Sequence, residues 1–274
     1  MLELAGLVAL GVFIGGYGTI IGAGGGFVLV PVLLLLYPEY EPEELTSISL
    51  FVVSLNALSG SVAYWRQRRI DYVTGLIFAT CATPGVVAGA VVVNYVPERL
   101  FTGLFGVMLL GLAAVSTRRR PQTIREPLRG SGVLVRRVSD TEGRTYVYAY
   151  RVWHAAVMSV GIGFVSSLFG IGGGVMQVPA MTILLHIPVQ FATATSLFSL
   201  SFMSGGASLL HAASGTLSGD LLVKALALAA GAIPGAQIGA LIAQRIRGRH
   251  ILLLLAVTIG LLGVRLLVKA VAHV

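Results

Sequence analysis

Charged residues are scarce in this sequence. They make up 11% of its 274 residues, whereas a soluble domain of ordinary composition has roughly 25%. Polar stretches are equally rare: only residues 117–150 form a long one, and apolar runs of about 20 residues recur on both sides of it. These features exclude an ordinary soluble protein and predict an all-α polytopic membrane protein.

Disulfides, buried acids and catalytic clusters are missing as well. The single cysteine, Cys81, excludes a disulfide within the chain. No Asp or Glu lies in the middle of an apolar segment, so we expect no proton relay through a buried carboxylate. The apolar segments hold no nucleophile–base pair or metal-ligand cluster, so the sequence predicts neither a membrane enzyme nor a cofactor. The net charge of +8 lies in loops between the segments, which argues against a nucleic acid partner.

Glycine, in contrast, is abundant and marks a motif that occurs twice. The first copy, at 22–31, reads Gly-Ala-Gly-Gly-Gly-Phe-Val-Leu-Val-Pro, and the second, at 170–179, reads Gly-Ile-Gly-Gly-Gly-Val-Met-Gln-Val-Pro. Three consecutive glycines hold a helix poorly, at about 1 kcal/mol each relative to alanine. Unwound backbone is tolerated in lipid only where protein buries it or where it lines a cavity. Paired breaks of this kind point to the binding site of a transporter.

Two further motifs repeat in the same order. Residues 84–90 (Pro-Gly-Val-Val-Ala-Gly-Ala) match 234–240 (Pro-Gly-Ala-Gln-Ile-Gly-Ala), and the Ser-Leu-Phe at 49–51 matches the one at 196–198. The common order and spacing indicate an internal duplication. We therefore divide the chain into transmembrane repeat 1 (1–116), a basic cytoplasmic linker (117–150) and transmembrane repeat 2 (151–274). Within the linker, 133–138 and 145–150 flank a glycine turn and predict a short β-hairpin.

The apolar pattern also predicts a topology. It contains ten segments: 2–22, 26–37, 46–64, 72–94, 100–116, 152–169, 174–187, 193–212, 219–243 and 250–271. Five segments in each half make two inverted repeats, with short, broken helices at the glycine motifs. The arginine-rich loops then share one side, which the positive-inside rule makes the cytoplasm, and both termini lie outside. The alternative fuses the first two segments of each half into one broken span, giving four plus four. We favour five plus five.

The glycine motifs can be interpreted in two ways, as an anion-binding site or as a means of close helix packing. Glycine lets the backbone turn sharply and lets a ligand approach its N–H groups, and a helix that begins after the turn offers unpaired N–H donors and a positive dipole end to an anion. Alternatively, glycines only let helices pack closely, as the repeats at 85–89 and 231–239 suggest. Because packing does not need three glycines in a row, we predict substrate binding at Gly24, Gly25, Gly26, Gly172, Gly173 and Gly174.

Small polar side chains in the neighbouring segments are the second set of candidates. Hydroxyl and amide groups can donate to an oxyanion, and we predict this role for Ser49, Asn56, Gln177, Thr193, Thr195 and Ser196. The alternative is that such groups only bond to the backbone of their own helix. Gln177 faces either the site or another helix. For His211 we expect helix packing or an interfacial position rather than chemistry.

Together these motifs resemble the TauE/SafE family of sulfite and organosulfonate exporters. The resemblance rests on the paired glycine motif, the run Thr-Ala-Thr-Ser-Leu-Phe at 193–198 and the Pro-Gly-x-x-x-Gly-Ala of both halves. It covers both repeats and leaves out 117–150. One position departs from the family pattern, because Ile48 stands where a threonine is usual. The resemblance implies movement of sulfite, thiosulfate, sulfoacetate or similar anions across the cytoplasmic membrane.

The expected function is therefore secondary transport of a small anion by alternating access. A passive anion channel is the alternative. The expected partners are the anionic substrate and the lipid bilayer, and a homodimer is left open. The substrate's identity, the direction of transport and the coupling ion do not follow from the sequence.

Overall fold

The computed structural model describes residues 2–117, 131–139, 145–246 and 248–272. The helices of the first half are α1 (Leu2–Ile21), α2 (Gly26–Leu36), α3 (Pro42–Arg66), α4 (Tyr72–Val92) with the 3₁₀ extension η1 (Val93–Tyr95), and α5 (Glu98–Thr117). Those of the second half are α6 (Val152–Leu168), α7 (Gly174–Pro179) with the π-helical extension η2 (Ala180–Leu184), α8 (Val189–Ala213), α9 (Gly219–Ala243) and α10 (Gly248–Ala272). All ten predicted apolar segments are helical.

The chain is a multi-pass helical membrane protein. Among the described residues, six helices are long and apolar enough to cross a membrane, and others are shorter apolar helices. Helix starts follow local rules: α3 begins with a capping box between Glu41 and Glu44, and α4 begins at Asp71, whose carboxylate accepts a hydrogen bond from the amide of Thr74. The all-α fold class predicted from the apolar runs is confirmed.

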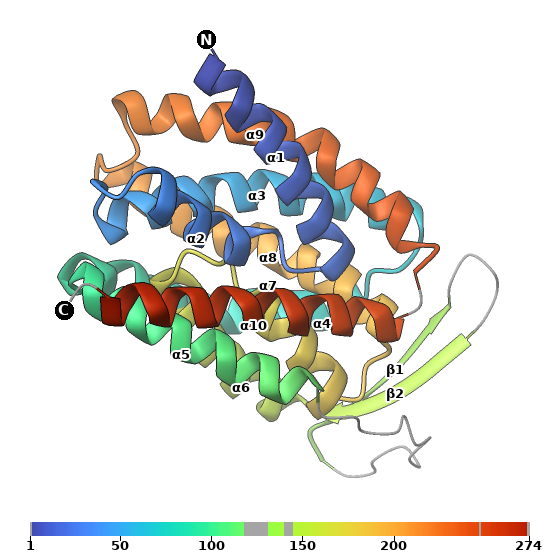
Figure 1. The fold of residues 1–274 in the computed structure, drawn as a ribbon. Helices are drawn as coiled ribbons and strands as arrows, with labels where there is room; N and C mark the ends of the chain where they lie inside the picture. Colours follow the sequence, from blue (N-terminus) through green and yellow to red (C-terminus); the bar gives the residue numbers. More distant parts are fainter. Residues whose placement is uncertain (1, 118–130, 140–144, 247, 273–274) are drawn as a thin grey trace.

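Helices of one half pack mainly against helices of the other half (Figure 1). Helix α1 packs along α9 of the other half, and α6 packs along α4 in the same way. Helices α3 and α8 lie against each other, and α5 lies against α10. This reciprocal pattern fits the predicted duplication, while the inversion of one repeat relative to the membrane stays a prediction.

Glycine brings the exchanged helices into backbone contact. A Cβ added to Gly85 of α4 would lie 2.0 Å from the carbonyl oxygen of Val160 in α6, and one added to Gly231 of α9 would lie 2.0 Å from that of Val8 in α1. No side chain fits at either position. The packing interpretation is therefore confirmed for the glycine repeats at 85–89 and 231–239.

Helices α1 and α2 form a hairpin rather than one broken span. The hydroxyl of Tyr37, at the end of α2, donates to the carboxylate of Glu3, at the start of α1, over 2.7 Å. The end of α2 therefore lies beside the start of α1, and the chain reverses at the glycine motif between them. Such a reversal is expected if each half has five separate segments, and it differs from a single broken span made of the first two.

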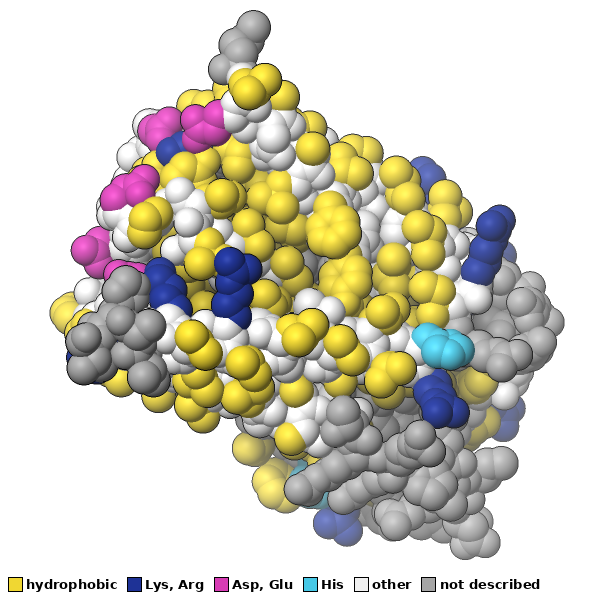
Figure 2. Space-filling view, viewed as in Figure 1, with side chains coloured by type: hydrophobic (Ala, Val, Ile, Leu, Met, Phe, Trp, Pro, Cys, Tyr) yellow, Lys and Arg dark blue, Asp and Glu magenta, His cyan; other side chains and the backbone are white. Residues whose placement is uncertain are grey.

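Charge separates the two ends of the helix bundle. Acidic side chains gather at the end where α3 and α9 begin, called here the acidic end (Figures 1 and 2). The opposite end, called the hairpin end, holds the arginine-bearing connections after α3 and α9 together with a β-hairpin. The hairpin consists of strands β1 (Val133–Ser139) and β2 (Thr145–Arg151) in antiparallel register. Its strands were predicted correctly, and its expected turn at 140–143 lies outside the described residues.

Candidate functional site

The two glycine motifs form two turns of the same shape. Turn 1 comprises residues 22–25 and turn 2 comprises residues 170–173. The backbone has positive φ at corresponding glycines of both turns: Gly22 (81°), Gly24 (70°), Gly25 (87°), Gly170 (65°), Gly172 (76°) and Gly173 (86°). An L-amino acid with a side chain would be strained at these positions, which explains why the turns need several glycines.

The turns touch each other in the interior of the protein. A Cβ added to Gly26, the first residue of α2, would lie 2.8 Å from the carbonyl oxygen of Gly170. One added to Gly174, the first residue of α7, would lie 2.5 Å from the Cα of Ala23. Each short helix therefore begins against the turn of the other half. Both turns are buried.

The starts of the two short helices are free of side-chain caps. Gly25 precedes α2 and Gly173 precedes α7, and neither position has a side-chain hydrogen bond to the helix. The first amides of a helix have no acceptor within it, and the aligned peptide dipoles make this end positive. Two such ends at one buried place can bind an anion without a charged side chain.

Two serines attach the turns to the long central helices. Ser49 of α3 donates from Oγ to the carbonyl oxygen of Gly170 over 2.6 Å, and Ser196 of α8 donates to that of Gly22 over 2.9 Å. The two serines occupy corresponding positions of the repeated Ser-Leu-Phe motif. Each fixes the turn of the opposite half, so the predicted residues Ser49 and Ser196 do lie at the glycine motifs.

Amide side chains complete what we call the central cluster. Its members are the two turns, Ser49, Asn56, Gln177, Ser196 and Ser199. Asn56 donates from Nδ2 to the carbonyl oxygen of Gly24 over 3.0 Å. Gln177 faces α8, where its Nε2 donates to Ser199 Oγ over 2.6 Å and its Oε1 lies 3.2 Å from Ser196 Oγ. All five side chains of this group are buried.

Several buried polar atoms near the turns lack a partner. Four of them have no hydrogen-bond partner among the described residues: Thr19 Oγ1, Asn56 Oδ1, Ser167 Oγ and Ser204 Oγ. An unpaired buried polar group costs about 1–3 kcal/mol. Ser204 Oγ lies 3.0 Å from a Cβ added to Gly172 of turn 2, so a water or solute beside turn 2 would give it a partner.

Two predicted residues lie differently. Thr193 packs with its backbone against Gly22, but its hydroxyl donates to Gln190 of its own helix over 3.1 Å. Thr195 Oγ1 accepts a hydrogen bond from the amide of Asp71 at the start of α4, 3.0 Å away, so it faces α4 rather than the turns. Adjacent helical residues point about 100° apart, which is why Ser196 and Thr195 face different neighbours. Substrate contact by any of these residues stays a prediction.

The sequence interpretation missed two buried hydroxyl residues that precede the turns. Thr19 and Ser167 were not singled out, although each stands three residues before the first glycine of its motif. Aligning the two repeats beyond the glycines would have found this pair. His211 is buried near the end of α8, with Nδ1 3.9 Å from Glu43, so it packs between helices as expected.

Comparison with known proteins identifies the family. The model of the sulfite exporter TauE/SafE family matches residues 7–266. This chain belongs to the TauE/SafE family. It is 32% identical over 272 residues to the probable membrane transporter protein YunE of Bacillus subtilis (strain 168), covering 97% of each chain. It is 24% identical over 275 residues to the probable membrane transporter protein MJ0441 of Methanocaldococcus jannaschii, covering 95% of this chain and 94% of the relative.

No solved structure matches the chain. The TauE/SafE match covers both repeats and confirms the resemblance drawn from the glycine motifs. It makes the protein a membrane transporter rather than an enzyme.

Proposed function

We propose that this TauE/SafE protein is a secondary transporter of small anions, of the sulfite, thiosulfate or sulfoacetate type, that works by alternating access across the cytoplasmic membrane. The observation that carries the proposal is the contact between turn 1 and turn 2. Each turn starts a short helix, and the two uncapped helix starts come together in the buried interior.

The chemistry of the central cluster suits an oxyanion that must bind and leave. Moving an anion out of water requires hydrogen bonds that replace its hydration. Main-chain amides at the helix starts and the second N–H of the Asn56 and Gln177 side-chain amides can supply them, because each amide nitrogen uses only one of its two protons in a hydrogen bond to another described residue. None of the residues of the central cluster is charged, so no permanent ion pair would trap the substrate. Hydrogen bonds to a charged group are worth about 1.5–3 kcal/mol each, which allows specific but reversible binding.

The duplication supports the transport cycle. If the repeats are inverted, each end of the protein can open by rearranging one half in the way the other half rearranges at the opposite end. The separation of charge supports the hairpin end as the cytoplasmic side, because arginine-rich connections are retained in the cytoplasm. Substrate would then reach the central cluster from either side in turn.

Counterflow in proteoliposomes tests this proposal. Vesicles are loaded with unlabelled sulfite, thiosulfate, sulfoacetate, taurine or sulfate, and uptake of the labelled anion is followed. A transporter gives saturable uptake that is accelerated by the same anion inside the vesicle. Flux that neither saturates nor responds to internal anion would support the channel alternative. Counterflow of other anions alone, such as chloride or a carboxylate, would contradict the sulfur substrate class.

A further inference from the structure

The two strands of the β-hairpin are docked onto the helix bundle. In the hairpin, Arg136 of β1 lies directly opposite Tyr148 of β2. Tyr146, Tyr148 and Tyr150 alternate along β2, so all three project from one face of the hairpin. Tyr148 and Tyr150 are buried in a hydrophobic cluster with residues of α4 and α8. This alternation of tyrosines was a sequence signal for a buried face.

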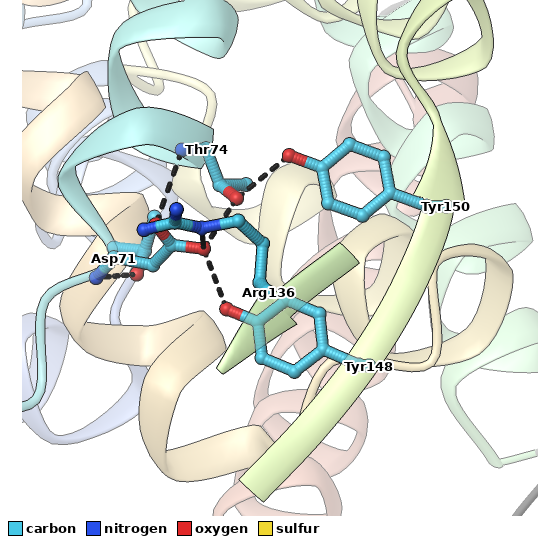
Figure 3. A network of polar contacts seen from close by, with 6 residues as sticks. Asp71, Thr74, Arg136, Tyr148 and Tyr150 are labelled. Carbon is cyan, nitrogen blue, oxygen red and sulfur yellow. Dashed lines mark hydrogen bonds and ion pairs between the residues drawn. The ribbon is translucent and has the colours of Figure 1, made fainter. Parts of the chain in front are cut away.

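The contact centres on Asp71, the residue that caps the start of α4 (Figure 3). Its side chain is 0% exposed. Arg136 donates from Nη2 to one carboxylate oxygen over 2.7 Å and from Nε over 3.0 Å, and Tyr148 donates its hydroxyl to the other oxygen over 2.6 Å. Thr74 Oγ1 lies 2.5 Å from the carboxylate and 2.7 Å from the hydroxyl of Tyr150. The hairpin thus supplies most of the partners of one buried carboxylate.

The carboxylate stays charged in this setting. Burial raises the pKa of Asp71, but the hydrogen bonds from Arg136, Thr74 and Tyr148 outweigh burial and hold that pKa below its ordinary value. A buried carboxylate that loses such partners must regain water. Separation of the hairpin from α4 therefore requires water to enter at the start of α4.

The same contact reaches α8 and, through it, turn 1. The amide of Asp71 donates to Thr195 of α8, and the ring of Tyr146 packs edge-on against Phe191 near the start of that helix. Ser196, next to Thr195, holds the carbonyl oxygen of Gly22 in turn 1. Ser196 lies seven residues after the first residue of α8, about 10 Å along the helix. The hairpin therefore covers the part of α4 and α8 that separates turn 1 from the hairpin end.

The corresponding helix of the other repeat also carries an aspartate in its first turn, but with different surroundings. Asp220 is the second residue of α9, and its side chain is 65% exposed. Its partners are Lys224, one turn along the same helix, and Tyr40. Asp220 therefore carries the same charge at the start of a helix without contacts from the described strands of the hairpin, and it offers a control at the acidic end.

We propose that the β-hairpin is a latch on the transport path, in which Arg136 and Tyr148 hold the starts of α4 and α8 together through Asp71 and must release them before the central cluster opens to the hairpin end. These are positioning residues, because they act through α4 and α8 and do not touch the turns. The inference rests on the proposed alternating access and adds the element that controls one of its two openings.

Cysteine accessibility tests the latch. Cys81→Ser removes the native thiol, and Val53→Cys places a reporter between the turns, since Val53 Cγ1 lies 2.9 Å from a Cβ added to Gly24 and 2.5 Å from one added to Gly172. Arg136→Gln and Asp71→Asn are expected to raise the rate at which a membrane-impermeant thiol reagent labels the reporter from the hairpin end by roughly tenfold or more, because charge-assisted bonds that favour the closed state are lost. Arg136→Lys should restore slow labelling in part.

Asp220→Asn is the control, and it should leave labelling from the hairpin end unchanged. Labelling from the acidic end should not rise in any latch variant. The proposal would be overturned if the reporter were labelled from the hairpin end at the same rate with Arg136 and with Arg136→Gln. An equal rise in the labelling rate of Asp220→Asn would overturn it as well. If Asp71→Asn does not fold, Arg136→Gln decides alone, because Arg136 is on the hairpin and its side chain is 25% exposed. Labelling needs no substrate, so this result is independent of whether sulfur anions show counterflow.

Discussion

Ser49 and Ser196 make one hydrogen bond in two copies, each to a carbonyl oxygen in the turn of the opposite half. Replacing either by alanine leaves that buried carbonyl unpaired, which costs about 1–3 kcal/mol. We expect counterflow to fall by about tenfold in Ser49→Ala and in Ser196→Ala, equivalent to about 1.4 kcal/mol. Ser61→Ala on α3 is the control, since its hydroxyl bonds to Ala57 of its own helix over 2.6 Å. A loss of the same size in the control would show that the two turn bonds have no special role.

A second prediction separates backbone strain from function. Gly173 in turn 2 and Gly215 before α9 have nearly the same φ, 86° and 83°. Alanine at either position costs about 1–2 kcal/mol for the left-handed backbone. A Cβ on Gly173 would lie 3.1 Å from Ser166 Oγ, 3.2 Å from Ser166 Cβ and 3.3 Å from Ile162 Cγ2, whereas one on Gly215 meets nothing within 4 Å.

Both alanine variants should therefore unfold at lowered temperatures in detergent, with the larger decrease for Gly173→Ala, while only Gly173→Ala loses counterflow. Full transport by Gly173→Ala would remove the main support for amide binding at turn 2.

At the scale of elements, the pairs α1–α9 and α4–α6 depend on glycines, which have no side chain at the contact. Gly85→Ala and Gly231→Ala would each drive a methyl group into a carbonyl of the facing helix, and overpacking of this kind typically costs about 1–3 kcal/mol. We expect a clearly lower unfolding temperature in detergent for both. Gly161→Ala on α6 is the matched control, because a Cβ there meets nothing within 4 Å. Unchanged unfolding of Gly85→Ala would mean that α4 and α6 can separate without loss.

The docked hairpin has a defined dependence on pH. The pKa of Asp71 is below its ordinary value, so its stabilising contribution is present above about pH 4 and is lost as pH falls through the lower folded value. Burial raises the pKa of Tyr150 to about 12. Its contribution is therefore complete below about pH 10 and is lost as pH rises through that folded value.

The difference in unfolding temperature between the wild type and Arg136→Gln should therefore be constant between about pH 5 and about pH 9. It should shrink in stronger acid, where Asp71 becomes protonated. A difference that varies between pH 6 and pH 8 would show that another group controls docking.

The elements were largely predictable from the sequence, and their contacts were not. Apolar runs, interrupted at the glycine motifs, predicted the ten helical segments, because a helix in lipid requires a long apolar run. The duplication placed Ser49 and Ser196 at the turns. The Asp71–Arg136 contact joins residues far apart in the chain, and no local pattern at either residue names the other. The unpaired hydroxyls near the turns became visible only once the packing was known.

For the whole molecule, the charge separation predicts an orientation. The hairpin end should face the cytoplasm, with the start of α1 and the end of α10 outside. In a Cys81→Ser background, an impermeant thiol reagent added to intact cells should label Glu39→Cys, at the acidic end, and not Arg66→Cys, at the hairpin end. Both positions are exposed. The reverse pattern would invert the orientation, and labelling of both would contradict a single topology.

The exchange of helices between the halves also has a consequence for biosynthesis. Helix α1 emerges from the ribosome well before its packing partner α9, which begins at Gly219. At about 5–20 residues per second, α1 waits on the order of ten to forty seconds in the bilayer for that partner. Neither half can complete its own tertiary structure during translation. Halves expressed from separate genes should accordingly be degraded when produced singly and should accumulate only when made in the same cell.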